Sequence, residues 1–446
     1  MNRRVLIVTP FFAPQSHAAV FRAYKLAKYL PRFGWTPHVV TVDTNYAYNE
    51  DDSLLAALPP EVQIHRARYV EPSPRGLGFA SGLADRRFAT LKRAGAFDAP
   101  SPAAAATGGA VEAPSWRALA GRRIRQSFKV PDAYWPWFLP AARLALQVSK
   151  TYDVPLVMTS ADPFTSYAIG LWLQRQGLRW VSDLRDPHTH VHYQSARTPF
   201  AYAIQRELER AAAVHADAIT VAARSIALIL NESYALDDDS RLHFIPTGLD
   251  PELVSASPPA RVGDPYVIFV GEYLSDYGDA FFRYFAEALK DESVSRRNYR
   301  IRIVGRREVN EPRIMPHLVR YGLTARVDFV DHVSQQELYP MLQAAEFAVL
   351  CFGENARWWC LPAKLVDYQA LRKPVLAIVP NPSEARARLS ETRLGIFLDG
   401  PSAVGTLTAA LSAGGAGYPG DERECARYGV LAQVEAFVRV FESLSR

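Results

Sequence analysis

The feature that most constrains the fold is the regular alternation of segment types between residues 327 and 378. Short apolar, strand-like runs occupy Val327–Val330, Phe347–Cys351 and Pro374–Ile378, and two segments with helical character separate them. Alternation of this kind is typical of parallel strands joined by crossover helices. The chain is therefore predicted to be an α/β protein built on parallel sheets.

A helix with a polar beginning is predicted after the second of these runs. Pro362 stands where this helix starts, a position that tolerates proline because its missing N–H donor would be unpaired there. Lys364, Asp367 and Leu371 then fall on one helix face. The amino end of a helix attracts phosphate, and ligands of parallel sheets bind at the carboxyl ends of the strands. These residues predict a nucleotide site, with Asp367 as the acceptor for the ribose hydroxyls.

Length and composition limit the possible protein classes. A chain of 446 residues exceeds one ordinary core, so two domains are expected, and 49% apolar with 22% charged residues is globular composition. No apolar run approaches the length of a membrane-spanning helix. The N-terminal run that begins at Val5 is interpreted as a buried strand rather than a signal peptide.

Cysteine use and charge indicate the compartment and the partners. Cys351, Cys360 and Cys425 form no C-x-x-C pair, and an odd number of cysteines suits a reducing cytosol. A cytoplasmic location is therefore expected. The net charge of +5 suggests contact with phosphates or acidic lipid headgroups, and it is too small to argue for nucleic acid.

Residues 72–130 interrupt the α/β pattern. Ala99–Ala113 is rich in Ala, Gly and Pro, and residues 114–130 follow as an amphipathic helix with a basic face. Two interpretations fit that helix. It lies on an anionic membrane surface as a peripheral contact, or it packs on the N-terminal domain with its basic face in solvent.

Two strands of the N-terminal half are predicted to end in carboxylates. Asp162 follows the strand Leu156–Ser160, and Asp186 follows Arg179–Ser182. We predict Asp162 as the first and Asp186 as the second candidate for the catalytic carboxylate, with Arg185 orienting Asp186 or binding an acidic acceptor. The competing interpretation of Asp162 is a helix cap before Phe164. An alternative role for Arg185 is a salt bridge to Asp183 that holds together the loop after this second strand.

The motifs around residues 362–375 resemble those of GT-B glycosyltransferases of the family 4 type. The family pattern P-x-K-x-x-E-Y followed by G-x-P-V stands here as Pro362 to Tyr368, with Asp367 for the glutamate, and Arg372 to Val375. Trp359 stands where the family has its first acidic residue. The S-x-x-P-F and D-x-R-D-P motifs near residues 160–187 resemble a subgroup that acts in surface-polysaccharide and lipid-linked sugar assembly.

The resemblance implies two Rossmann-like domains that face each other across a cleft. It implies an acceptor-binding domain at residues 1–255, a nucleotide-sugar-binding domain at 256–423, and a helix at 424–446 that crosses back to the first domain. The segment Phe244–Asp250 is similar to the family's I-P-N-G-x-D boundary, with Thr247 for the asparagine.

The resemblance also implies a donor site whose family cations are missing here. After Gly271 the family continues with arginine and lysine, whereas this chain has Glu272 and Tyr277 at these positions in G-E-Y-L-S-D-Y-G. A buried diphosphate still needs compensating charge. The expected donor-binding residues are Gly271, Arg306, Arg307, His332, Lys364 and Asp367.

On the acceptor side, Arg22 keeps the arginine of the family's N-terminal motif, and Ser16 and His17 occupy its glycine-rich turn. His188 is expected to line the acceptor site. His188, His190 and His192 form H-x-H-x-H, but no carboxylate or cysteine partner has a telling position, so no metal is expected.

The resemblance implies transfer of a sugar, with anomeric retention, from a nucleoside diphosphate sugar to a saccharide or lipid-linked acceptor. No metal or other cofactor is expected, because helix amides, arginine and lysine can stabilise the leaving diphosphate. The alternative is a non-catalytic nucleotide-sugar-binding or scaffold protein of the same fold. A sugar-nucleotide epimerase is a third interpretation, although those enzymes have different signature residues.

Overall fold

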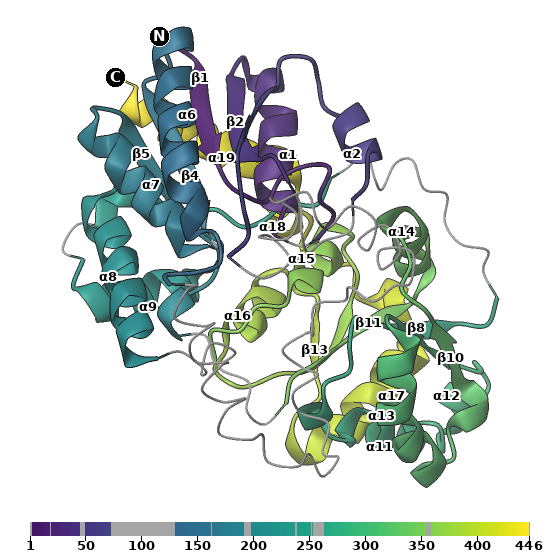
Figure 1. Cartoon of the computed structure of the whole chain (residues 1–446). Coiled ribbons are helices and arrows are strands. Elements are labelled where there is room, and N and C mark those ends of the chain that lie inside the picture. The colour runs from purple at the N-terminus through teal and green to yellow at the C-terminus, as the bar shows by residue number, and fades with distance from the viewer. Residues whose placement is uncertain are drawn as a thin grey trace, which may run out of the picture. The chain divides into compact units, whose positions relative to one another are not determined.

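The computed structural model divides the chain into two compact units, each with its own parallel sheet (Figure 1). One unit comprises Met1–Ile245 together with Val434–Arg446, and the other comprises Pro246–Gln433. The structure describes residues 2–17, 19–44, 50–72, 130–161, 163–190, 198–236, 239–250, 252, 263–353 and 358–445. The expected amphipathic helix at 114–130 lies outside these residues except for Val130.

The first unit contains a seven-stranded sheet in the order β3-β2-β1-β4-β5-β6-β7. All of its neighbouring strands pair in parallel. The central strands are buried on both faces, which explains their continuous apolar sequences. The strands are β1 Arg4–Val8, β2 Thr36–Val42, β3 Gln63–Ala67, β4 Leu156–Ala161, β5 Arg179–Leu184, β6 Ala218–Val221 and β7 Leu242–Phe244.

Helices follow the strands of this unit. One of them, α7, lies close to β5, because Gly170 leaves room for the buried indole of Trp180. The described helices are α1 Phe21–Tyr29, η1 Leu30–Phe33, α2 Ser53–Ala56, η3 Trp135–Trp137, α6 Phe138–Tyr152, α7 Phe164–Arg175, η4 His188–His190, α8 Pro199–His215, α9 Arg224–Tyr234 and η6 Asp239–Arg241.

The C-terminal residues pack within the first unit. They belong to α19, Val430–Leu444, which begins in the second unit. The ring of Phe441 lies 5.4 Å from that of Trp35, and the guanidinium of Arg22 lies 5.2 Å from the ring of Phe437. The end of the helix thereby completes the core of the N-terminal sheet.

The second unit contains a six-stranded parallel sheet in the order β10-β9-β8-β11-β12-β13. The strands are β8 Tyr266–Val270, β9 Arg300–Val304, β10 Val327–Val330, β11 Phe347–Cys351, β12 Val375–Ile378 and β13 Gly395–Phe397. The helices are η7 Ser275–Tyr277, α11 Ala280–Ala288, α12 Glu292–Ser295, α13 Arg307–Arg320, η8 Thr324–Arg326, α14 Gln335–Ala344, α15 Ala363–Ala370, α16 Glu384–Glu391, η9 Gly400–Ser402, α17 Ala403–Ala413, η10 Gly415–Gly417 and α18 Glu422–Ala426. The α/β class with parallel sheets is therefore confirmed.

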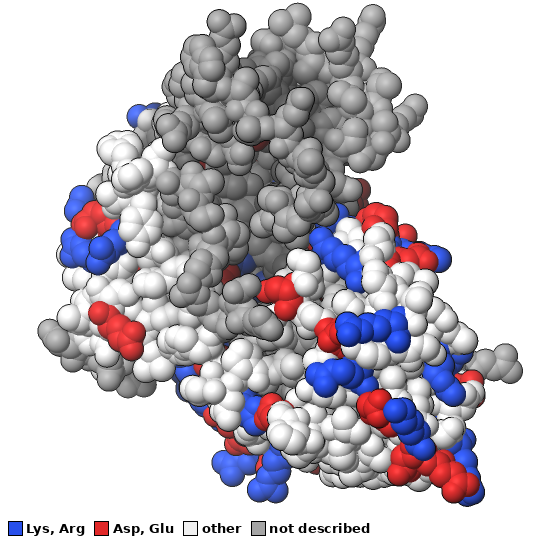
Figure 2. Space-filling view, turned by 90° about the horizontal axis from the view of Figure 1, so that it is seen from below, with Lys and Arg blue, Asp and Glu red and all other residues white. Residues whose placement is uncertain are grey.

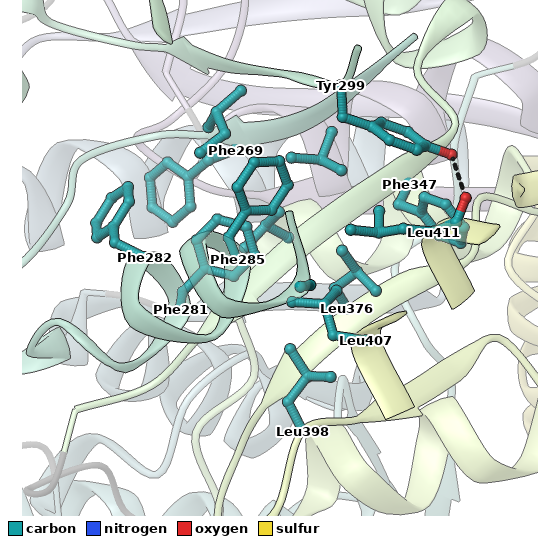
Figure 3. Packing of buried hydrophobic residues seen from close by; sticks show 14 of the residues in the cluster. Phe269, Phe281, Phe282, Phe285, Tyr299, Phe347, Leu376, Leu398, Leu407 and Leu411 are labelled. Atoms are coloured by element: carbon teal, nitrogen blue, oxygen red, sulfur yellow. Dashed lines mark hydrogen bonds between the residues drawn. The ribbon is translucent and has the colours of Figure 1, made fainter. Parts of the chain in front are cut away.

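Two apolar layers enclose this second sheet. Along β8, Phe269 faces the layer formed with α11, α13 and α17, whereas Ile268 faces the layer formed with α14, α15 and α16. Figure 3 shows Phe281, Phe282 and Phe285 of α11 packed in the first layer. Because the strands are parallel, the loops after β8, β9, β10 and β11 all leave the same edge of the sheet.

Charged side chains of both signs are interspersed on the described surface that is visible in Figure 2. Several charged residues form exposed ion pairs with a residue three or four positions away, such as Lys290 with Glu287 at 2.7 Å. Pairs of this kind contribute little to stability. The net positive charge is thus not gathered into one area of this described surface.

Among the described residues, no helix combines the length and the apolar character that crossing a bilayer requires.

Gly170 gives a test of the packing between α7 and β5. A Cβ atom at Gly170 would lie 2.2 Å from the Trp180 ring, which cannot easily move because its Nε1 donates to Thr159 Oγ1 at 2.8 Å. We expect Gly170→Ala to lower the free energy of unfolding by about 1–3 kcal/mol in urea denaturation. Gly405→Ala is the matched control, because its helical site is open, and it should raise stability by up to ~1 kcal/mol. Equal effects of the two substitutions would contradict the packing argument.

Candidate functional site

Two glycines shape the carboxyl edge of the second sheet. Gly271 follows β8 with φ +102° and Gly305 follows β9 with φ +152°, both in the region that favours glycine. A Cβ atom at Gly305 would lie 2.5 Å from the carbonyl oxygen of Gly271, whereas the space beside Gly271 itself is open. The buried Asn310 of α13 holds the loop, since its amide donates to Gly271 O at 3.0 Å and accepts from Tyr273 N at 2.8 Å. The loop is therefore fixed while its surface stays accessible.

The two arginines predicted to bind the donor diphosphate both contact carboxylates. Arg306 Nε donates to Glu272 Oε1 at 2.8 Å, and Arg307 Nε donates to Glu311 Oε2 at 2.7 Å. Glu272 follows Gly271 directly, so the acidic residue that replaces a family cation neutralises the arginine at the end of the next strand. Sequence reasoning did not predict this pair.

Lys364 lies at the beginning of α15, which starts at Ala363 after Pro362, as predicted. Its Nζ donates to the carbonyl oxygen of Val270 at 2.8 Å and lies 4.0 Å from the centre of the Phe269 ring. Burial lowers the pKa of Lys364 to about 8, and the buried thiol of Cys351 opposes this shift. The ammonium is thus placed against the end of β8, beside Gly271.

Asp367 and His332 occupy separate parts of this edge. Asp367, one helical turn after Lys364, accepts a hydrogen bond of 3.4 Å from the buried Tyr339 of α14. His332 lies in the exposed loop after β10, where Asp331 Oδ1 accepts from His332 N at 2.7 Å and from Arg307 N at 3.3 Å. The edge brings Gly271, Arg306 and Lys364 together around β8, and it connects His332 to Arg307 through Asp331.

The first unit has a buried charge network at its centre. The carboxylate of Asp183 in β5 accepts from Arg22 Nε at 2.9 Å and from a second Arg22 nitrogen at 2.8 Å. Ser160 of β4 and Thr220 of β6, which lie opposite Asp183 in register, donate to it at 3.0 and 2.6 Å. Burial alone raises the pKa of Asp183, but Arg22 and Thr220 outweigh it and hold the pKa below its usual value.

Arg22 was predicted to contact the acceptor, and the structure places its side chain in the interior with 2% exposure. Its partner Asp183 is 161 residues away in sequence, and the expectation from the sequence had been a bridge between Asp183 and Arg185. Arg185 donates instead to two main-chain oxygens, Ala161 O at 2.9 Å and Ala19 O at 2.7 Å. It thereby connects the ends of β4 and β5 with the loop after β1.

His17 lies in that loop after β1. Its ring meets the ring of Phe11 edge-on at 5.0 Å, and burial followed by the charge of Arg185 lowers its pKa to about 4. Ser16 beside it is half-buried, and Asp186 after β5 is exposed. Of the residues predicted for the acceptor side, His17 and Arg185 therefore lie near each other in the structure.

Two predicted residues cannot be placed by their side chains. Asp162 lies outside the described residues, and of His188 only the backbone at the start of η4 is described. The next residue, Thr189, is held by the buried Glu209, which accepts from Thr189 N at 2.9 Å and from its Oγ1 at 2.7 Å. Within the described ranges, no three His, Cys, Asp or Glu side chains are arranged to hold a metal ion.

Comparison with known proteins connects the second unit to a family. Residues 264–402 match the model for glycosyl transferases group 1. A search of curated proteins finds no significant match. The matched segment begins just before β8 and ends after β13, so it contains the whole second sheet.

Solved structures resemble the chain over nearly its full length. Sucrose-phosphate synthase from Thermosynechococcus elongatus is 14% identical over 99% of both chains, with a TM-score of 0.58. A glycosyltransferase from Rickettsia africae is 12% identical over 99% of this chain and 98% of its own, with a TM-score of 0.59. HepE of Anabaena, solved with UDP and glucose, is 12% identical over 99% of both chains, with a TM-score of 0.56. At these identities the likeness shows the fold alone, and it confirms the predicted GT-B fold.

The buried pair gives a prediction for the stability of the first unit. We expect Arg22→Met to lower the free energy of unfolding by about 3–5 kcal/mol, because it leaves the Asp183 carboxylate buried without its cation. Urea unfolding followed by tryptophan fluorescence measures this, since Trp35, Trp137 and Trp180 are buried in that unit.

Arg3→Met is the control for this experiment. Arg3 pairs with Glu442 at 3.0 Å on the surface, so the loss should stay below about 1 kcal/mol. Because the folded pKa of Asp183 is lowered, its stabilisation should be complete above about pH 4 and decline as the pH falls through the folded value. Similar losses in the two variants would contradict a structural role for the buried pair.

Proposed function

We propose that this protein is a glycosyltransferase that moves a sugar from a nucleoside diphosphate sugar to a saccharide or lipid-linked acceptor. The observation that carries the proposal is the match of residues 264–402 to the glycosyl transferases group 1. That segment contains the sheet edge where Gly271, Gly305 and the amino end of α15 come together. The chemistry of this sheet edge suits an anionic ligand. HepE, which shares the fold, was solved with UDP and glucose.

The donor diphosphate would lie against the open face of Gly271, near the first turn of α15. Exposed helix amides favour a phosphate at that end, and Lys364 adds a cation beside it. An anion there raises the pKa of Lys364 from about 8 and keeps the ammonium protonated. The carboxylate of Asp367 would accept hydrogen bonds from the ribose hydroxyls, and the loop around His332 would contact the base.

Transfer requires stabilisation of the negative charge that develops on the leaving diphosphate. Lys364, Arg306 and the amides of α15 would supply it without a metal ion. The acceptor side is assigned to the first unit, where Asp162 or Asp186 would support the reacting hydroxyl and Arg185 would hold the loop ends together. The same proposal includes retention of the anomeric configuration, a hexose as the transferred sugar and a role in surface-polysaccharide assembly.

A second candidate function is nucleotide-sugar binding without catalysis. It is favoured by one specific observation, that Arg306 and Arg307 are both engaged by carboxylates. A donor that meets these pairs gains less compensation for its charge than it would from two unengaged arginines. The two candidates differ in whether a sugar leaves the bound donor.

Calorimetry with UDP-, GDP- and TDP-sugars tests the donor site. We expect at least one of them to bind, and Asp367→Ala to weaken that binding by about tenfold or more through loss of the ribose contact. Glu292→Ala, which removes an exposed carboxylate of α12 in the same unit, is the matched control and should bind like the unaltered protein. Absence of binding for every donor would refute the proposal.

Transfer to an acceptor then separates the two candidates. Release of the nucleoside diphosphate with formation of a product in the presence of a saccharide or lipid-linked acceptor supports catalysis. Loss of transfer in Asp162→Ala or Asp186→Ala supports the assigned carboxylates. Donor binding with no transfer to any acceptor would favour the non-catalytic candidate. If both variants transfer normally, the catalytic assignment is wrong.

Glu272 gives a prediction that is specific to this chain. We expect Glu272→Gln to strengthen nucleotide-sugar binding by about 3- to 10-fold, because Arg306 then offers an uncompensated charge to the diphosphate. Glu311→Gln, beside Arg307, is the control at the more exposed pair and should have the smaller effect. Weaker binding in Glu272→Gln would mean that Glu272 orients Arg306 for the ligand.

Peripheral contact with an anionic membrane is assigned to residues 114–130, of which only Val130 is among the described residues. Their basic amphipathic sequence carries this part of the proposal. Flotation with liposomes that contain acidic lipids should be reduced when these residues are deleted. Equal flotation of the full chain and the deletion variant would remove the membrane contact from the proposal.

A further inference from the structure

A pocket of about 450 Å³ lies at the amino-terminal edge of the second sheet. Glu346 and Pro374 in its wall directly precede β11 and β12, so the pocket lies at the opposite ends of these strands from Gly271 and α15. Its volume falls within the range of small-molecule sites. It therefore does not belong to the proposed donor site, and nothing in the proposed function uses it.

Positive charge dominates the wall of this pocket. Arg297, Arg372 and Lys373 line it together with a single carboxylate, Glu346. The exposed Glu422, which lies outside the lining, pairs with Arg372 Nη1 at 3.5 Å, so one positive charge remains in excess. That carboxylate is already engaged, since it accepts from Arg297 at 2.7 Å, from Tyr299 Oη at 2.5 Å and from Gly415 N at 3.2 Å. An anionic ligand would balance the remaining charge.

Lys373 is incompletely paired. Its Nζ donates to Gln343 O at 3.0 Å and to Ala345 O at 2.5 Å, so the third N–H of the ammonium has no partner among the described residues. Burial lowers the pKa of Lys373 to about 8, and the charge of Glu346 opposes that shift only in part. An anion in the pocket would both accept the third hydrogen bond and restore the protonated form.

Arg372 adopts a backbone conformation that favours glycine. Its φ is +52°, in the left-handed region, and the related family motif G-x-P-V has glycine at this position. Its guanidinium donates to Pro419 O at 3.2 and 3.3 Å and lines the pocket. The left-handed backbone thus places the guanidinium of Arg372 at the pocket wall, where Pro419 O and Glu422 hold it.

We propose that this pocket binds a small anion that carries a phosphate group, held by Arg372 and Lys373. A phosphate group carries the negative charge that the pocket wall lacks, and arginine and lysine are the side chains that bind phosphate through several N–H donors. The glycines at 414 and 415 and Tyr418 form an uncharged part of the wall, which suits the body of a phosphorylated small molecule. Free phosphate and a phosphomonoester share this chemistry.

Calorimetry on the full chain with inorganic phosphate, glucose 6-phosphate and glucose tests the proposal. We expect both phosphates to bind saturably and glucose not to bind. Tighter binding of glucose 6-phosphate identifies a phosphomonoester as the ligand, and equal binding identifies free phosphate. Absence of phosphate binding up to about 10 mM would overturn the proposal.

Substitutions locate the binding. Arg372→Gly should weaken phosphate binding by about tenfold or more without lowering the midpoint of thermal unfolding, since glycine relieves the left-handed backbone. Arg393→Gly is the matched control: Arg393 is also left-handed, with φ +53°, and exposed, but it does not line the pocket. Lys373→Gln provides a second variant with the same expected loss. Unchanged binding in both Arg372→Gly and Lys373→Gln would place the phosphate elsewhere and refute the inference.

Discussion

The parallel pairing of the strands is the constraint on which the rest of each unit depends. Parallel strands need crossover connections, and these cover both faces of a sheet with helices. All carboxyl ends then meet at one edge, where the loops after β8 and β9 and the start of α15 come together in the second unit. The same rule leaves the opposite edge to the segments that precede the strands, and there the cationic pocket around Lys373 is formed.

Within this frame, charge compensation decides what each polar residue can do. The side chain of Asp183 is fully buried. Its negative charge is tolerated there because Arg22, Ser160 and Thr220 all donate hydrogen bonds to the carboxylate. Arg306 is compensated by Glu272, so its charge is shared before any ligand arrives. Lys364 and Lys373 contact main-chain oxygens, and their lowered pKa values reflect burial that a neutral partner does not offset. The two lysines are therefore the cations that gain most from a bound anion.

Sequence patterns predicted buried central strands well, whereas of the four strands at the sheet edges only β10 was predicted. The strand β11 has the predicted bounds, because a strand buried in a parallel sheet is a continuous apolar run. Three edge or short strands, β3, β7 and β13, were not predicted, since polar or three-residue segments carry no clear period. Helix α6 was also missed, although Ala141, Ala145 and Val148 lie buried at helical spacing, so its signal was present in the sequence.

The sequence by itself determined the α/β class, the parallel sheets and the start of α15 after Pro362, because these follow from local periodicity and from the backbone chemistry of proline. The tertiary structure alone decided the partners of the charged residues. Arg22 meets Asp183 across 161 positions, and Arg306 meets Glu272 across 34. Such contacts depend on strand order and register, which bring distant residues together, and no short stretch of sequence contains that information.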